Sequence, residues 1–121
     1  MRALLATILI AVLATSAAAE TRQVIGYAGV LGEWELTADV TEAASGELSG
    51  PATMTHVGLC TQDGPEQRTG DIRLQISASR LNATLSLAGL QCTYDGRLSD
   101  AYKGQMSCPD RPAMPLTLWV R

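Results

Sequence analysis

The sequence predicts an all-β domain, a small antiparallel barrel or sandwich of the meander type that is held together by a disulfide. Beyond residue 20, apolar residues recur at every second position and no helical period appears. Glycine, proline, asparagine and aspartate interrupt these segments every several residues, which is typical of all-β sandwiches and barrels. Two cysteines also fall opposite each other in the strand pairing that the apolar pattern requires.

The first 19 residues have the pattern of a secretory signal peptide. Arg2 supplies a positive start, residues 3–14 are almost wholly apolar, and the alanines at 17–19 supply small side chains before a cleavage site. Crossing a bilayer takes about 20 apolar residues, so this run is too short for a membrane anchor. We therefore predict a signal peptide at 1–19 and a single exported β domain at 20–121, with no transmembrane segment after cleavage.

The charge balance argues against some classes of partner. The chain has 9 basic and 12 acidic residues and a formal net charge of −3. Loss of Arg2 with the signal peptide leaves 8 basic against 12 acidic residues, a net charge of −4. A nucleic-acid binder needs a basic face to neutralise phosphates, so we expect neither nucleic acid nor an anionic membrane surface as a partner.

The N-terminal half of the domain is less sharply patterned. Residues 33–40 predict a strand with one wet face. Its apolar face carries Trp34, Leu36, Ala38 and Val40. Residues 51–60 predict a further strand, whose inner face the pattern does not define. The segments 42–51 and 62–70 are rich in small and turn-forming residues, and we expect both to be loops.

The C-terminal half predicts a register as well as strands. Turns at 77–80, 88–89 and 99–101 bring the apolar residues of successive strands opposite each other, and the other face is almost wholly polar. The expected pairs are Ile72 with Leu85, Leu74 with Ala83, Ile76 with Leu81, Ala83 with Tyr94, Leu85 with Cys92, Leu87 with Leu90, Tyr94 with Met106, Gly96 with Gly104, Leu98 with Tyr102 and Cys92 with Cys108. Leu116, Leu118 and Val120 extend the same face. A slip of one residue would exchange the two faces. Closure into a barrel also removes exposed edges, which favours the barrel over the sandwich.

Cys92 and Cys108 are predicted to form a disulfide. Opposed residues at a non-hydrogen-bonded position lie close enough for the bond, and an exported protein meets an oxidising compartment. No C-x-x-C spacing indicates a redox pair. For Cys60 three roles remain open: a buried free thiol, a competitor for Cys92 or Cys108, or a bond to another chain.

No residue pattern indicates catalysis, a metal or a cofactor, so we expect a protein that is not an enzyme. His56, the only histidine, shares a strand face with Met54 and, in a regular strand, with Cys60. This set suits copper, but no second histidine completes a common site. No nucleophile elbow supports a Ser–His–Asp triad. Glu33 and Glu35 are more simply a solvated face than a pair of catalytic carboxylates.

Trp34, Trp119 and His56 are the candidate contact residues for a partner. Trp119 falls on the polar face of the expected register, and an exposed tryptophan is a candidate contact. Covering the barrel end or meeting the N-terminal strand are its alternative roles.

Residues 32–36, Gly-Glu-Trp-Glu-Leu, resemble the Gly-x-Trp opening strand of calycin-type barrels. These include lipocalins, avidins and the small bacterial metalloprotease inhibitors of the alkaline-protease-inhibitor family. The resemblance implies that Trp34 closes one end of the barrel. It covers five residues and no further lipocalin or avidin motif is present, so it implies no ligand-binding residues.

A broader resemblance covers roughly the last half of the chain. The pentapeptide Cys-Thr-Tyr-Asp-Gly at 92–96, followed by Gly104 and Cys108, is similar to the ending of small exported bacterial β domains with no assigned function. The Gly-Leu-Cys segment at 58–60 belongs to the same resemblance. It implies a bacterial source, and therefore a periplasmic or secreted location, but no activity.

We therefore expect a non-enzymatic barrel that binds a small molecule or a protein of the cell envelope. The alternative is a periplasmic or secreted inhibitor of a hydrolase, acting through its N-terminal segment or a loop such as 42–51. A small-molecule binder should hold an apolar cavity of roughly a few hundred Å³. An inhibitor should instead have a filled core and an ordered, projecting segment.

Overall fold

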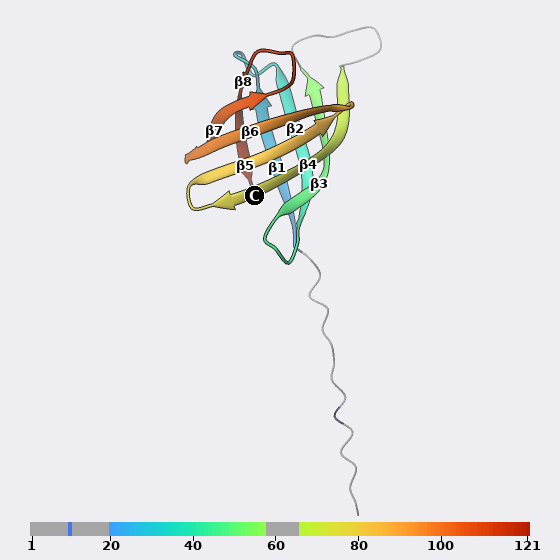
Figure 1. Ribbon diagram of the computed structural model, residues 1–121, viewed down its shortest axis with the longest axis vertical. Coiled ribbons are helices and arrows are strands. Elements are labelled where there is room, and N and C mark those ends of the chain that lie inside the picture. Colours follow the sequence, from blue (N-terminus) through green and yellow to red (C-terminus); the bar gives the residue numbers. More distant parts are fainter. Residues whose placement is uncertain (1–9, 11–19, 58–65) are drawn as a thin grey trace, which may run out of the picture.

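The computed structural model describes residues 10, 20–57 and 66–121. These residues form eight strands (Figure 1): β1 (Thr21–Ala28), β2 (Trp34–Glu42), β3 (Leu48–His56), β4 (Gln67–Ser77), β5 (Arg80–Leu87), β6 (Leu90–Ser99), β7 (Ala101–Ser107) and β8 (Met114–Val120). The predicted signal peptide, apart from residue 10, and Cys60 lie outside the described residues. Within the described ranges, no helix has the length and apolar character to cross a membrane.

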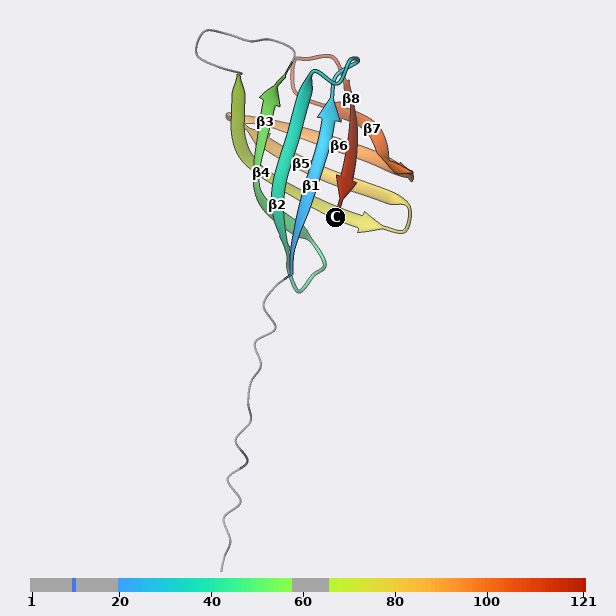
Figure 2. The ribbon, with the colours of Figure 1, turned by 180° about the vertical axis from the view of Figure 1, so that it is seen from behind.

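The eight strands form one closed antiparallel barrel in which each strand pairs with its neighbours in the sequence (Figure 2). β1 also pairs with β8, from Val24 opposite Val120 to Ala28 opposite Leu116. This pairing leaves no free edge in the sheet. The predicted all-β meander is therefore confirmed, and of its two forms the structure is the barrel.

The predicted register of the C-terminal strands is confirmed throughout β4 to β7. Ile72 lies opposite Leu85, Leu85 opposite Cys92, and Tyr94 opposite Met106. Two-residue turns join β4 to β5 and β5 to β6, and their first residues, Ala78 and Ala88, have φ of 54° and 50°. A positive φ at this position gives a hairpin turn the twist of its flanking strands.

The N-terminal half differs from the expectations in its loops. Residues 42–51 were expected to be a loop, but β2 ends at Glu42 and β3 begins at Leu48, so only 43–47 connect them. The small residues have a packing role, because a Cβ on Gly50 would collide with the main-chain carbonyl of Asp39 on β2. β4 likewise begins at Gln67, inside the segment 62–70 that was also expected to be a loop.

The bounds of two further strands also depart from the sequence pattern. β3 ends at His56, short of the expected strand end at residue 60. β1 was not expected at all. Its inward residues are Val24, Gly26 and Ala28, whose side chains are too small to stand out as an apolar face. Its extended conformation is fixed by partners on both sides, β2 and β8.

The inner face of the barrel is filled by aliphatic and methionine side chains, together with Tyr94 and Cys92. Among the described residues, no charged residue and no other polar residue is buried. The largest fully buried side chains are Leu36, Ile72, Leu74, Leu81, Leu85, Leu116 and Leu118. An eight-stranded barrel is just wide enough for its own side chains to fill it. The interior is therefore a packed core.

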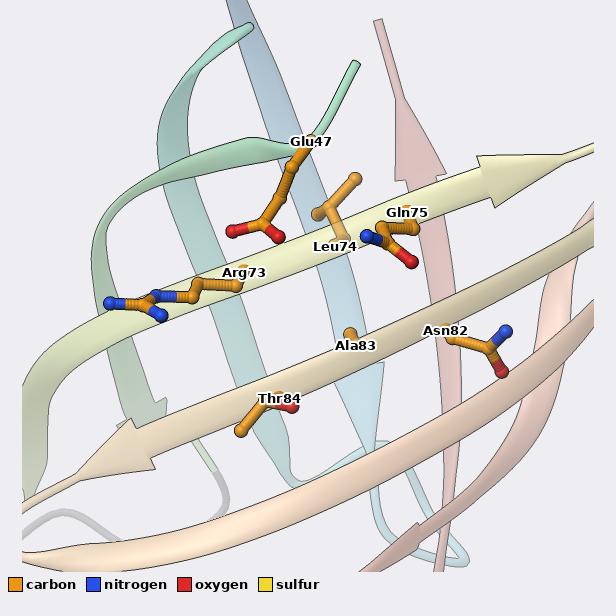
Figure 3. A pocket seen from close by; sticks show the side chains of 7 residues that line it. All are labelled: Glu47, Arg73, Leu74, Gln75, Asn82, Ala83 and Thr84. Carbon is orange, nitrogen blue, oxygen red and sulfur yellow. The ribbon is translucent and has the colours of Figure 1, made fainter. Parts of the chain in front are cut away.

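Polar side chains cover the outer face of the C-terminal strands, as predicted. Figure 3 shows Arg73 and Gln75 on β4 and Asn82 and Thr84 on β5. Asn82 lies opposite Gln75 and Thr84 opposite Arg73. The alternation along each strand thus separates a dry inner face from a wet outer one.

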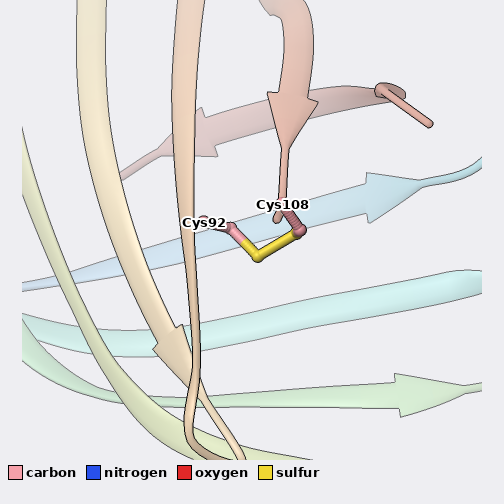
Figure 4. Close-up of a disulfide and its surroundings, with 2 residues drawn as sticks. All are labelled: Cys92 and Cys108. Carbon is pink, nitrogen blue, oxygen red and sulfur yellow. A yellow bond between two sulfur atoms is a disulfide. The ribbon is translucent and has the colours of Figure 1, made fainter. Parts of the chain in front are cut away.

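The predicted disulfide between Cys92 and Cys108 is present (Figure 4). The two Cα atoms lie 4.3 Å apart, one position beyond the last β6–β7 pair, which joins Thr93 and Ser107. That spacing is typical of a closely spaced, non-hydrogen-bonded pair. A disulfide is also compatible with an oxidising, exported location.

We predict that the disulfide leaves one free thiol. The chain has three cysteines, so alkylation of the denatured but unreduced protein should modify Cys60 alone, as read by intact mass. Reduction should lower the free energy of unfolding by about 3 kcal/mol. The bond joins cysteines 16 residues apart, and its loss frees the unfolded chain from that closed loop. Three modified thiols without reductant would refute the bridge.

Tyr94 brings a polar atom into the core and satisfies it there. Its hydroxyl donates a hydrogen bond of 2.9 Å to the main-chain carbonyl of Leu116 on β8. Burial, and to a smaller extent the negative charge of Asp95, raises the pKa of Tyr94 to about 12. The ring also requires a glycine at position 96, where an added Cβ would collide with the tyrosine ring.

We predict that Tyr94→Phe lowers the free energy of unfolding by about 1–2 kcal/mol at pH 8, because the Leu116 carbonyl loses its partner. A tyrosine ionises near pH 10 when unfolded, whereas Tyr94 stays neutral in the folded state to about pH 12. The wild-type advantage is therefore complete below pH 10 and is lost as the pH rises toward 12. Urea unfolding of both proteins across this range measures it, and an unchanging difference would contradict the account.

Candidate binding site at one end of the barrel

Side chains from three neighbouring strands meet at one end of the barrel, and two of them are candidate contact residues. Trp34 begins β2, His56 ends β3, and Arg68 is the second residue of β4. Trp34 and His56 lie directly opposite each other, and Arg68 lies opposite Met54, the next inward residue of β3. We call this end of the barrel the mouth.

The indole of Trp34 is the centre of the mouth. The imidazole of His56 meets it edge to face, with ring centroids 4.5 Å apart and planes at 77°. The guanidinium carbon of Arg68 lies 5.1 Å from the centroid of the indole, within the range of a cation–π interaction. Arg68 also donates a hydrogen bond of 3.3 Å to the Glu66 carboxylate. Trp34 is partly buried and packs against the core. It lies at one end of the barrel because it is the first residue of β2.

A small cavity of about 80 Å³ remains below Trp34. Its apolar lining comes from β2, β3, β5, β6, β7, β8 and the β7–β8 connection: Trp34, Met54, Leu87, Leu90, Cys92, Met106, Cys108, Pro112 and Met114. Arg68 and Arg111 are the charged residues that line it. Three methionines make the wall adaptable, because the unbranched thioether repacks readily. The cavity has room for one small apolar group, since a water molecule takes up about 30 Å³ in the liquid.

His56 contributes packing to the mouth, and one ring nitrogen is left without a partner. Its Nδ1 is buried and has no hydrogen-bond partner among the described residues. Its main-chain N–H donates to the carbonyl of Glu66 at 2.8 Å. Met54 shares the inward face with His56, as predicted, whereas Cys60 lies outside the described residues. In the part of the chain that the structure describes, no three His, Cys, Asp or Glu residues gather as a metal site.

The turn between β1 and β2 presents two aliphatic side chains at the same end of the barrel. Val30 and Leu31 are 86% and 90% exposed. The turn is tied to the start of β8, because the N–H of Gly29 donates to the Pro115 carbonyl at 2.9 Å. Val30 and Leu31 therefore stand on an ordered turn next to Met114, which lines the cavity.

Glu33 holds this turn in place. We expected it on a solvated face, and its carboxylate accepts an exposed hydrogen bond from the Leu31 N–H at 3.0 Å. Its main-chain carbonyl accepts another from the Val57 N–H at 2.8 Å. Gly29 has φ of 96°, and a Cβ there would collide with the Glu33 carboxylate. The conformation of the turn thus depends on both residues.

Trp119 lies away from the mouth, on the outer face of β8. It is 39% exposed, as predicted from the register, and lies opposite Ile25 of β1. Its ring meets that of Tyr27 edge to face, with centroids 5.9 Å apart. Trp119 therefore contacts the N-terminal strand β1, which was one of its predicted roles. The prediction that it covers the barrel end is wrong, because the ring lies on the outer face. Its role as a partner contact stays a prediction.

The sequence pattern did not predict a role for Arg68, Arg111 or the exposed turn. Arg68 was detectable, because it continues the inward positions of β4, at 72 and 74, toward the N-terminus. Arg111 lies in the connection after β7, and nothing in its local sequence indicates that it lines a cavity with Trp34. Val30 and Leu31 have no alternating neighbours that reveal their exposure.

No protein-family model, curated protein or solved structure matches this chain. The geometry defines a small closed meander barrel with a filled interior and an apolar mouth. Both family resemblances stay predictions.

We predict that the Arg68 guanidinium stabilises Trp34. Arg68→Met should lower the free energy of unfolding by about 0.5–1 kcal/mol, the value of an exposed cation–π pair. In a Trp119→Phe background it should also increase acrylamide quenching of Trp34. Arg73→Met, on the outer face of the same strand, is the matched control and should change neither. Equal effects of the two substitutions would contradict the role of Arg68.

Proposed function

We propose that the protein is an exported, non-enzymatic binding protein that recognises a protein partner in the cell envelope through its mouth. The observation that carries this proposal is the cavity of about 80 Å³, apolar and placed at one end of a filled core. It accepts a single apolar side chain of a partner.

The size of the cavity favours a protein over a free small molecule. Pockets for drug-sized ligands have volumes of about 300–1,000 Å³ and bury most of the ligand. The interior below the mouth is occupied by fully buried side chains such as Leu36, Leu85 and Leu116. A protein needs no such volume, because a few buried anchor residues provide most of the binding energy of an interface.

The surroundings of the cavity also fit a protein interface. Val30 and Leu31 add exposed aliphatic surface at the same end of the barrel, and clustered exposed apolar surface is typical of interaction sites. Arg111 places positive charge beside an apolar wall, whereas the charge of Arg68 is paired with the Glu66 carboxylate. A partner segment with an apolar side chain and a neighbouring carboxylate therefore suits the mouth.

A non-enzymatic role is supported by the arrangement around His56. Its ring packs against Trp34, and its buried Nδ1 receives no hydrogen bond from any described residue. A general base needs a nucleophile within hydrogen-bond reach.

Inhibition of a hydrolase is the second candidate, and the ordered turn favours it. The N-terminal segment is incorporated in the barrel from Thr21 onward, and the loop at 43–47 carries small or polar side chains. The β1–β2 turn instead combines exposed aliphatic side chains with main-chain hydrogen bonds, as a rigid inhibitory loop requires.

We predict that partner binding depends on the turn. Immobilised mature protein is exposed to periplasmic extract, and the retained proteins and small molecules are identified by mass spectrometry. Leu31→Asp should abolish retention of the specific partner, with affinity lowered at least roughly tenfold. The matched control is Leu98→Asp, which alters an apolar residue 50% exposed near the far end of β6 and should leave retention unchanged.

Two results would count against this function. Equal retention by wild type and both variants would show that the turn takes no part, and a small molecule in place of a protein would overturn the choice of partner. If the retained protein is a hydrolase, its activity with and without wild-type barrel decides between simple binding and inhibition.

A further inference from the structure

The outer wall of β5, β6 and β7 carries three cations in one row. Arg97 of β6 lies directly opposite Arg80 of β5 on one side and Lys103 of β7 on the other. All three are exposed, because they occupy the outward positions of their strands. We call Arg80, Arg97 and Lys103 the cationic row.

The cationic row is unfavourable for the barrel by itself. Like charges directly opposite each other on neighbouring strands destabilise a sheet. One acidic side chain lies beside the row: the Asp95 carboxylate is 3.5 Å from Nε of Arg80. Arg97 and Lys103 have no ion pair within the described residues. This local excess of positive charge stands on a chain with a net charge of −3.

The row borders a broad shallow hollow of about 730 Å³ over the same three strands. Asp95 also lines the hollow, between Asn82 and Gln105 on the neighbouring strands. Apart from Asp95 and the cationic row, the outward side chains that line it are neutral hydrogen-bonding groups: Asn82, Thr84, Thr93, Gln105 and Ser107. Their side chains make no hydrogen bond to another described residue. Asn82 and Thr84 also line the neighbouring hollow over β4 and β5, together with Arg73 and Gln75 (Figure 3). The polar surface is therefore continuous across four strands.

We propose that this outer wall is a binding site for an anionic oligosaccharide. The carboxylate, sulfate or phosphate groups of the sugar bind the cationic row through charge-assisted hydrogen bonds. The sugar hydroxyls bind the amides and hydroxyls of Asn82, Thr93 and Gln105, which both donate and accept hydrogen bonds.

The lining of the hollow favours a saccharide over other anionic macromolecules. A protein interface depends on buried aromatic or aliphatic anchors, and no outward residue of this hollow is apolar. Single-stranded nucleic acid binds by stacking its bases on exposed aromatic rings. The aromatic residue near the hollow, Tyr94, is buried with its ring in the core.

This site is separate from the mouth. The mouth is formed by inward side chains at the strand ends, whereas the cationic row and its hollow lie on the outer wall. A failure of one proposal leaves the other unaffected, because they share no residue that faces a ligand.

Isothermal titration of the mature protein with a galacturonate tetrasaccharide and a heparin-derived tetrasaccharide tests the site. Wild type should bind at least one of the two, and binding should weaken as salt rises. Arg97→Gln combined with Lys103→Gln should lower the affinity at least roughly tenfold. Arg121→Gln, which removes an exposed cation at the end of β8, is the control and should leave the affinity unchanged. Circular dichroism of each variant should match that of wild type, because all these side chains are exposed.

Further ligands make the test specific. A neutral tetrasaccharide of the same length should bind more weakly by at least roughly tenfold, and inorganic phosphate alone more weakly than either anionic sugar. The proposal is overturned if wild type binds neither anionic sugar, if Arg121→Gln weakens binding as much as the double variant, or if a single-stranded oligonucleotide binds more tightly than both sugars.

Discussion

The pairing of β1 with β8 is the interaction on which the rest of the structure depends. It closes the sheet, and closure fixes the interior volume that the inward side chains fill. The seam requires small inward residues on β1, because a Cβ on Gly26 would collide with the Leu118 side chain and lie 2.9 Å from the Thr117 carbonyl. The same small residues that make β1 inconspicuous in the sequence therefore allow the barrel to close.

A filled, closed barrel restricts where function can reside. The middle of the interior is occupied by aliphatic side chains, so binding is left to the strand ends and the outer wall. Trp34 and Arg68 close one end over a small apolar cavity. Arg97 and Lys103 lie on the opposite surface of the same sheet from the core. One alternating pattern thus produces both an apolar mouth and a polar, locally cationic wall.

The alternating pattern was sufficient to predict the register of β4 to β7 and the Cys92–Cys108 disulfide. There, apolar residues occupy most of the inward positions and short turns leave one pairing possible. The pattern failed at β1 and at Gly50, where close approach of neighbouring strands demands small residues. It failed again for Arg111, because a residue in a connection reaches the cavity only through the closure of the whole sheet.

Nuclear magnetic resonance of the mature protein tests barrel closure most directly. The N–H of Gly29 donates to the Pro115 carbonyl, and that of Arg121 donates to the Gln23 carbonyl. The odd-numbered residues of β1 therefore form the hydrogen-bonded pairs with β8. The even-numbered residues form the non-hydrogen-bonded pairs, in which the Cα atoms lie closer together. Closure predicts Hα–Hα nuclear Overhauser effects between Gly26 and Leu118. It also predicts slow exchange of the β1 amides that face β8. Absence of these contacts, together with rapid exchange along that edge, would show an open sheet and contradict the account.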